Sequence, residues 1–264
     1  MRYDEQAPRC PLLPAVVELW QRLGHTVLDL PVDADGARVE DLGGGVDVVS
    51  LTPAHQFPLG GALSPRRRGL VCDWAARTGG YIVEDDYDGE FRFDRRPVAA
   101  LQRSAPDRVI YAGSVSKTLS PDLRIGWLVL PDELVAPTAH AVATLTGGVP
   151  LLNQLALADF IASGDYERHV RAQRREYARR RLLLRNALHA HGLTVPGIPA
   201  GLHAVIEPAA TVAPSGTRVA VHTLGRYSRT HPVPDALVVG FATPARKDVD
   251  AAVAALMSTL APPS

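Results

Sequence analysis

The chain has 264 residues, of which 46% are hydrophobic and 21% charged, and its 28 Lys and Arg balance its 28 Asp and Glu to a formal net charge of zero. These values exclude a mainly disordered chain and the broad positive field of a stand-alone nucleic-acid binder. Arg, Asp, Gly or Pro interrupts every apolar run before the ~18 residues that a membrane span needs, so we expect a soluble protein without a membrane partner.

Strand-length apolar runs alternate with segments of helical period through the first half of the chain. This alternation predicts βα units and a largely parallel sheet. The expected strands cover residues 25–30, 46–51, 80–84, 109–112 and 125–130, and the expected helices cover residues 11–24 and 65–78.

After Pro131 the pattern changes to long helical stretches, followed by weaker strand signals. We expect helices at residues 151–163 and 166–191, and strands at 204–207 and 237–241. The turn-prone Ser163-Gly164-Asp165 marks a boundary. The predicted domains are therefore residues 1–164, an α/β unit, and residues 165–264, a smaller α+β unit.

Cys10 and Cys72 lie far apart, and neither has the close neighbours that a zinc site or a disulfide framework needs. We therefore predict no metal and a reducing cytoplasm. The charged N-terminal residues are not followed by the apolar segment of a secretory signal, so export is not expected.

Residues 113–126 carry the strongest chemical signal in the chain. Lys117 stands in a Ser-rich turn at the predicted carboxyl end of a strand, where α/β folds bind ligands, so it is placed as an amine nucleophile. The hydroxyls of Ser114 and Ser116 and the guanidinium of Arg124 can together hold a phosphate. A lysine beside a phosphate site indicates pyridoxal phosphate.

A second segment, residues 81–91, takes an apolar strand directly into a cluster of acids. A carboxylate there can keep the pyridine nitrogen of the cofactor protonated, and Asp85 is predicted for that role. Tyr87 can donate a hydrogen bond to the ring oxygen. The remaining acids are interpreted as solvated or paired with nearby arginines rather than as a cation site: Asp86, Asp88 and Glu90, with Arg92, Arg95 and Arg96 as partners.

Three ordered strings, residues 51–60 (LTPAHQFPLG), 84–91 (EDDYDGEF) and 114–124 (SVSKTLSPDLR), resemble the aminotransferase-type domain of MocR-type transcriptional regulators of the GntR superfamily. The resemblance extends over essentially the whole chain and is weaker after about Pro214. It implies a fold-type-I pyridoxal-phosphate large domain, incomplete here, related to class I and II aminotransferases, with a smaller C-terminal α+β domain.

The resemblance also implies roles for single residues. Lys117 matches the lysine that forms the internal aldimine with pyridoxal phosphate. Asp85 matches the partner of the pyridine nitrogen, and Tyr87 matches the contact to the ring oxygen. Ser114 and Arg124 match the phosphate ligands.

The chain departs from the family pattern in four places. It opens at Met1 inside the aminotransferase part, so we expect no winged-helix DNA-binding domain and no direct DNA binding. The preceding segment, which supplies further cofactor contacts in the family, is not expected either. Phe57 stands where aminotransferases carry an asparagine that contacts the ring. His55 or Gln56 can compensate for this loss, although a hydrogen-bonded turn histidine is the simpler interpretation of His55. Val238 stands where the substrate-carboxylate arginine is expected.

The basic helix predicted near residues 168–185 carries eight arginines. With zero net charge and few aromatic residues nearby, it favours an amphipathic connecting helix over a nucleic-acid site.

Three functions fit these observations. The first is a sensor that binds pyridoxal phosphate on Lys117 and recognises a small amine or amino-acid effector. The second is a pyridoxal-phosphate-dependent aminotransferase acting on an amino acid or amine, and the third is a degenerate remnant without cofactor. A homodimer is expected in the first two cases, because in the resembled fold each cofactor pocket borrows residues from the partner subunit.

Overall fold

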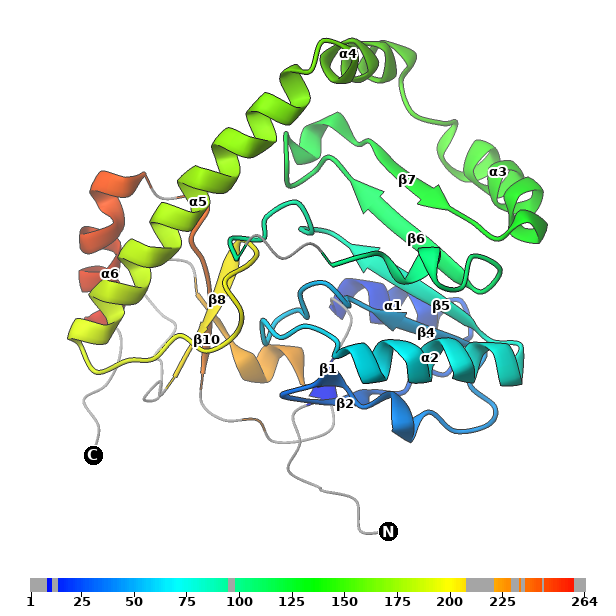
Figure 1. Ribbon diagram of the computed structural model, residues 1–264, viewed down its shortest axis with the longest axis horizontal. Coiled ribbons are helices and arrows are strands. Elements are labelled where there is room, and N and C mark those ends of the chain that lie inside the picture. The colour runs from blue at the N-terminus through cyan, green and yellow to red at the C-terminus, as the bar shows by residue number, and fades with distance from the viewer. Residues whose placement is uncertain are drawn as a thin grey trace.

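The computed structural model describes residues 9–10, 14–94, 98–207, 221–228, 233, 236–243 and 245–258 (Figure 1). Its helices are α1 (Pro14–Arg22), α2 (Pro65–Thr78), α3 (Asp132–Thr146), α4 (Leu151–Ala162), α5 (Asp165–Ala190) and α6 (Val249–Met257). Its strands are β1 (Arg9–Cys10), β2 (Leu30–Asp33), β3 (Gly36–Ala37), β4 (Val48–Leu51), β5 (Tyr81–Asp86), β6 (Val109–Ser114), β7 (Gly126–Val129), β8 (His203–Ile206), β9 (His222–Thr223) and β10 (Leu237–Gly240).

A four-stranded sheet in the order β4-β5-β6-β7 forms the first unit. β4, β5 and β6 are parallel, whereas β7 is antiparallel to β6. The predicted α/β class with a largely parallel sheet is thus confirmed. Because parallel strands end at the same edge of a sheet, the segments that follow β4, β5 and β6 meet there.

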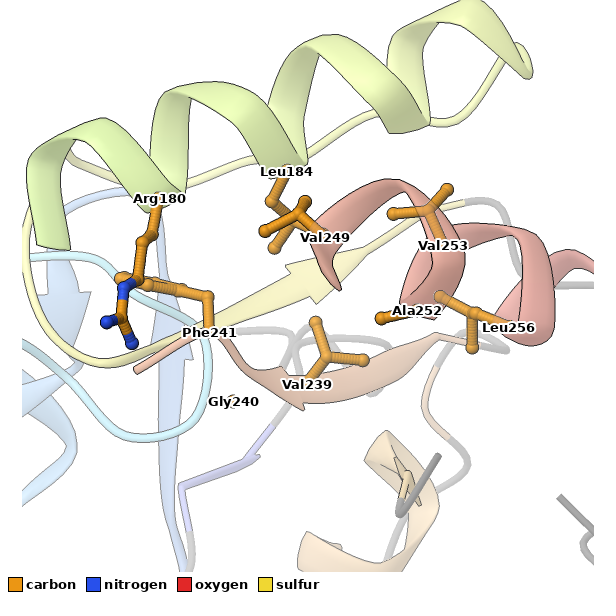
Figure 2. Close-up of a pocket in the computed structure, with 9 residues that line it drawn as sticks. All are labelled: Arg180, Leu184, Val239, Gly240, Phe241, Val249, Ala252, Val253 and Leu256. Carbon is orange, nitrogen blue, oxygen red and sulfur yellow. The ribbon is translucent and has the colours of Figure 1, made fainter. Parts of the chain in front are cut away.

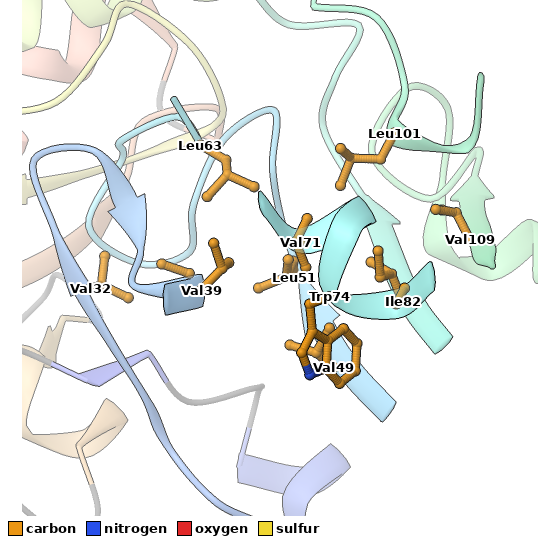
Figure 3. Packing of buried hydrophobic residues seen from close by; sticks show 12 residues of the cluster. Val32, Val39, Val49, Leu51, Leu63, Val71, Trp74, Ile82, Leu101 and Val109 are labelled. Atoms are coloured by element: carbon orange, nitrogen blue, oxygen red, sulfur yellow. The ribbon is translucent and has the colours of Figure 1, made fainter. Parts of the chain in front are cut away.

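The core of this unit lies between the sheet and α2 (Figure 3). Val71 and Trp74 of α2 pack against Val49 and Ile82 of β4 and β5, and Ile82 is fully buried. The local sequence explains the position of α2. Ser64 caps its N-terminus by accepting a hydrogen bond from the main-chain N–H of Arg67, and Gly79 ends the helix in the left-handed conformation.

Arg67 joins α2 to the β2–β3 hairpin from a buried position, with 4% of its surface exposed. Its guanidinium donates hydrogen bonds to both carboxylate oxygens of Asp33, to both of Glu40 and to the carbonyl of Gly36. A buried guanidinium is stable only when its donors are paired, and these bonds pair them. The strand predicted at residues 25–30 is wrong, because the turn at Gly36 (φ 91°) places the hairpin strand at Leu30–Asp33.

The second unit contains the antiparallel sheet β8-β10-β9, α6 and the C-terminal half of α5. Long α5 runs from α4 to this sheet (Figure 1). A cavity of about 50 Å³ lies between α5, β10 and α6, and its lining is apolar apart from Arg180 (Figure 2). This cavity is a gap in the apolar core of the unit and contains none of the predicted site residues. The predicted division between residues 164 and 165 stays a prediction.

Apolar side chains are exposed along β7, α3 and α4. No residue of α3 or α4 is buried, and all four residues of β7 are exposed. The most exposed large hydrophobic residues of this surface are Leu145, Leu151 and Leu152. We refer to the surface formed by β7, α3 and α4 as the apolar face. Among the described residues, every helix is too short or too polar to cross a membrane.

Candidate functional site

The carboxyl ends of β4, β5 and β6 bring the predicted site residues together. Strand pairing sets Leu51 beside Glu84 and Asp85 beside Ala112, so the three strands end within three residues of one another. His55 follows β4, Asp85 and Tyr87 lie at the end of β5, and Lys117 follows β6. The positive charge of Lys117 lies close enough to the Asp85 carboxylate to lower the pKa of that group.

Lys117 lies in a tight turn that α5 holds in place. The N–H of Leu119 donates to the carbonyl of Val115 over 2.8 Å, which closes the turn. Buried Thr118 is contacted from α5: Tyr166 Oη donates to its hydroxyl over 3.1 Å, and His169 Nε2 lies 2.8 Å from its carbonyl oxygen. The neighbouring Lys117 side chain is exposed, so its amine is accessible to a ligand.

Three acids around Asp85 each have a hydrogen-bond donor within the chain, although the second oxygen of Asp86, Oδ1, is buried without one among the described residues. Glu84, which is 3% exposed, accepts hydrogen bonds from two main-chain N–H groups, those of residues 101 and 102. Asp86 accepts from Tyr111 Oη over 2.7 Å, and Asp88 Oδ2 lies 2.8 Å from His55 Nδ1. The expectation that Asp88 is solvated or paired with arginine is therefore wrong: it is 2% exposed and bonded to His55.

Asp85 differs from these neighbours. Among the described residues, its carboxylate has no hydrogen-bond donor. Its pKa is raised to about 6, first by burial and then by the negative charges of Asp86 and Asp88, while Lys117 opposes the shift. A half-buried carboxylate without a donor is poorly stabilised, and a cationic N–H group placed against it would stabilise it.

Tyr87 and His55 lie against each other at this edge. The Tyr87 hydroxyl is 3.1 Å from the carbonyl oxygen of His55 and 3.2 Å from its Nδ1. His203, from β8 of the second unit, packs with its ring 5.0 Å from that of His55. Burial is the main cause that lowers the pKa of His203 to about 3, against the opposing contact with the carbonyl of Pro58, so its imidazole is neutral at physiological pH.

The predicted phosphate ligands follow β6. Ser114 is the last residue of that strand, and Ser116 stands two residues later in the Lys117 turn. Arg124 is exposed and has φ 53°, a left-handed conformation that costs a non-glycine residue about 1–2 kcal/mol. Within the described part of the chain, the hydroxyls and the guanidinium of these three residues have no hydrogen-bond partners, which leaves them free for a ligand.

Arginines outside the turn are used structurally. Arg92 pairs with Asp94 and donates to the carbonyl of Ala54, whereas Arg95 and Arg96 lie outside the described residues. Along α5, Arg168, Arg171 and Arg180 pair with acids one turn away on the same helix. The described contacts of this helix thus agree with a connecting role.

The sequence interpretation missed three contacts of the site. These are the hydrogen bond between Asp88 and His55 and the contacts of Tyr166 and His169 with the Lys117 turn. His55 and Asp88 are 33 residues apart, and the residues of α5 are about 50 residues from the turn, so only the tertiary fold brings them together.

Asp85 predicts a pH dependence of stability. An aspartate with its ordinary pKa of 3.8 in the unfolded chain and about 6 in the folded chain destabilises the fold as the pH rises between these values. We expect Asp85→Asn, without cofactor, to melt at a higher temperature than wild type near neutral pH, with the difference shrinking toward about pH 4. Calorimetry at several pH values measures this, and exposed Asp107→Asn is the control. A difference that does not change with pH would contradict the prediction.

Comparison with known proteins places the chain in a family. The model of the family described as "Aminotransferase class I and II" matches residues 49–256, which include β4 through α6 and every predicted site residue.

The curated relatives are named as bacterial regulatory proteins, several of them as helix-turn-helix transcriptional regulators. The chain is 35% identical over 201 residues to the pyridoxine biosynthesis regulator PdxR of Corynebacterium glutamicum, covering 74% of this chain and 44% of that protein. It is 43% identical over 160 residues to the probable rhizopine catabolism regulatory protein MocR of Rhizobium meliloti, covering 60% and 32%. The chain thus spans a third to about half of such relatives, which it matches in the aminotransferase-like region.

Solved structures share the fold. The α-aminoadipate aminotransferase LysN of Thermus thermophilus, complexed with N-(5'-phosphopyridoxyl)-L-leucine, aligns with a TM-score of 0.82 at 22% identity, over 97% of this chain and 72% of that one. An archaeal alanine:glyoxylate aminotransferase aligns with a TM-score of 0.82 at 21% identity, over 94% and 67%. The fold is that of the fold-type-I pyridoxal-phosphate proteins, and the chain belongs to the aminotransferase class I and II family.

Proposed function

We propose that this chain binds pyridoxal phosphate, attached covalently to Lys117, and that it is the effector-sensing part of a MocR-type transcriptional regulator. The observation that carries the proposal is the contrast between Asp85 and its neighbours. Glu84, Asp86 and Asp88 each accept at least one hydrogen bond from the protein, whereas the half-buried Asp85 has no donor among the described residues. A protonated pyridine nitrogen is the donor that this carboxylate lacks.

Other polar groups at this edge suit the rest of the cofactor. Ser114, Ser116 and Arg124 would hold the phosphate, because hydroxyls and a guanidinium bind phosphate by charge-assisted hydrogen bonds. Tyr87 would donate to the ring oxygen. When bound, pyridoxal phosphate would supply an aldehyde that condenses with amines and a pyridine ring that withdraws electrons from the condensed amine.

The exposed amine of Lys117 suggests the class of effector. A small amine or amino acid can reach the same carbonyl carbon and exchange with the lysine, and the release of Lys117 would signal its presence. The curated relatives, whose names describe regulators, support sensing as the function.

The second candidate is an aminotransferase that acts on an amino acid or amine, which the family match favours. In that case Lys117, once released, would move a proton within the bound substrate. Val238 argues against an α-amino acid substrate: it is 6% exposed, within an apolar cluster that includes Phe57 and Tyr227, where the resemblance places a carboxylate-binding arginine.

The apolar face supports a homodimer. Two apolar helices and an edge strand without buried residues leave side chains exposed that soluble proteins usually cover. We propose that a second copy of the chain covers this face.

Reduction with borohydride tests the attachment of the cofactor. After incubation with pyridoxal phosphate, peptide mapping should find the reduced phosphopyridoxyl group on Lys117, and Lys117→Ala should lose the visible absorption band. The chain has one other lysine, Lys247, so Lys247→Ala is a matched control that should retain the band. A phosphopyridoxyl group found on Lys247 alone would favour the third possibility, a degenerate remnant without a specific cofactor site. An absorption spectrum that is the same in Lys117→Ala and wild type would favour it too.

A turnover assay separates the sensor from the enzyme. We expect an amine added to the cofactor-loaded protein to change its absorption spectrum once, without sustained conversion of an amino donor and a keto acid. Chromatography of the products over many equivalents measures conversion. Continued product formation that Lys117→Ala abolishes would identify an aminotransferase instead.

Sedimentation analysis tests the dimer. Wild type should sediment as a dimer, and Leu145→Lys combined with Leu152→Lys should shift it toward monomer, because both side chains are about 80% exposed on the apolar face. Leu28→Lys, at a similarly exposed leucine outside that face, is the control. A wild-type monomer over the whole concentration range would exclude the proposed dimer.

A further inference from the structure

A buried hydrogen bond joins the loop after β4 to the loop after β5. His55 Nδ1 lies 2.8 Å from Asp88 Oδ2, and the two residues are 3% and 2% exposed. An ionised carboxylate only accepts hydrogen bonds, so the proton lies on Nδ1 and is donated to Asp88. This bond fixes both the orientation and the tautomer of the imidazole, as a carboxylate commonly does for histidine.

The same histidine contacts Tyr87. Because Nδ1 already donates to Asp88, it cannot accept the phenolic proton at 3.2 Å. The Tyr87 hydroxyl instead donates to the main-chain carbonyl of His55 over 3.1 Å. The position of the phenol thus depends on where the main chain at His55 lies, and Asp88 anchors that residue.

We propose that His55 and Asp88 are positioning residues, which hold the Tyr87 hydroxyl in place for the ring oxygen of pyridoxal phosphate; this inference rests on the function proposed above. Asp88 acts through His55, and His55 acts through its carbonyl. Neither side chain needs to touch the cofactor. The phenol has one proton, so cofactor binding would turn it from the His55 carbonyl to the ring oxygen. The phenol already lies beside the site before the cofactor arrives, which lowers the entropic cost of binding.

The turn before β8 packs closely against the pair. Gly201 lies directly on it: a Cβ built there would be 2.1 Å from His55 Cε1 and 2.7 Å from Asp88 Oδ2. Gly201 also donates its N–H to the carbonyl of Phe91 over 2.9 Å, and Phe91 donates to the carbonyl of Asp88 over 2.9 Å. The turn before β8 therefore covers the pair and keeps it in one geometry.

A metal site is the other interpretation of these residues, because nitrogen or oxygen atoms of His55, Asp88 and His203 lie within 4.8 Å of one another. The hydrogen bonds favour positioning. His55 and Asp88 use these atoms for each other, and His203 Nε2 lies 3.1 Å from the carbonyl oxygen of Pro58. One potential ligand atom of each residue, His55 Nδ1, Asp88 Oδ2 and His203 Nε2, is thus already used in a contact within the protein.

A double-mutant cycle on the affinity for pyridoxal phosphate tests the proposal. Asp88→Asn and Tyr87→Phe should each weaken binding roughly three- to tenfold, the loss of about one hydrogen bond. If Asp88 acts through Tyr87, Asp88→Asn should have little further effect in the Tyr87→Phe background, and the bound cofactor should have the same absorption spectrum in all three variants. Glu90→Gln removes a half-buried acid from the same loop, outside this hydrogen-bond chain, and should bind like wild type.

His55→Gln is the second probe, because it keeps the main-chain carbonyl but removes the ring, and thermal melting checks the fold of each variant. Its effect should likewise depend on the presence of the Tyr87 hydroxyl. Effects of Asp88→Asn and Tyr87→Phe that multiply, or wild-type affinity in Asp88→Asn, would overturn the positioning role while leaving cofactor binding intact. A wild-type protein that does not bind the cofactor would overturn the proposed function and, with it, this inference.

Discussion

The partial burial of one carboxylate that has no hydrogen-bond donor among the described residues is the constraint on which the site depends. Asp85 is fixed at the end of β5 by its pairing with Ala112, and the fold raises its pKa to about 6 rather than supplying it with a hydrogen bond. Because the fold destabilises the ionised Asp85 carboxylate, a cation that binds beside this carboxylate stabilises the folded protein. The same feature accounts for the proposed cofactor contact and for the pH dependence expected of the protein without cofactor.

The parallel strands explain how the remaining groups reach Asp85. Each of β4, β5 and β6 ends at the same edge, so residues from three separate segments converge without long loops. The second unit completes this edge through close main-chain contacts. Ile198 donates to the carbonyl of Gly60 over 2.9 Å, and Gly201 fits against His55 only because it has no side chain.

Sequence patterns predicted helices and strands well where the spacing of apolar residues agreed with the capping residues at the ends of the element. The helix at residues 65–78 has a capping serine, a following proline and a terminal glycine, and it is found at those residues. The helix α3 was missed because Pro137 lies inside it and no side chain caps its N-terminus. The convergence of Lys117, Asp85 and Tyr87 was predictable because each follows or ends a strand. The hydrogen bond between His55 and Asp88 was not, because nothing local in the sequence pairs residues 33 positions apart.

The titration of the Asp85 carboxyl carbon, followed by NMR with and without pyridoxal phosphate, tests the central claim most directly. The account predicts a midpoint near 6 in the cofactor-free protein and a carboxylate that stays ionised well below that pH once the cofactor is bound. An Asp85 signal that titrates at the same pH in both states would show that the pyridine nitrogen does not lie against this carboxylate, and would contradict the account.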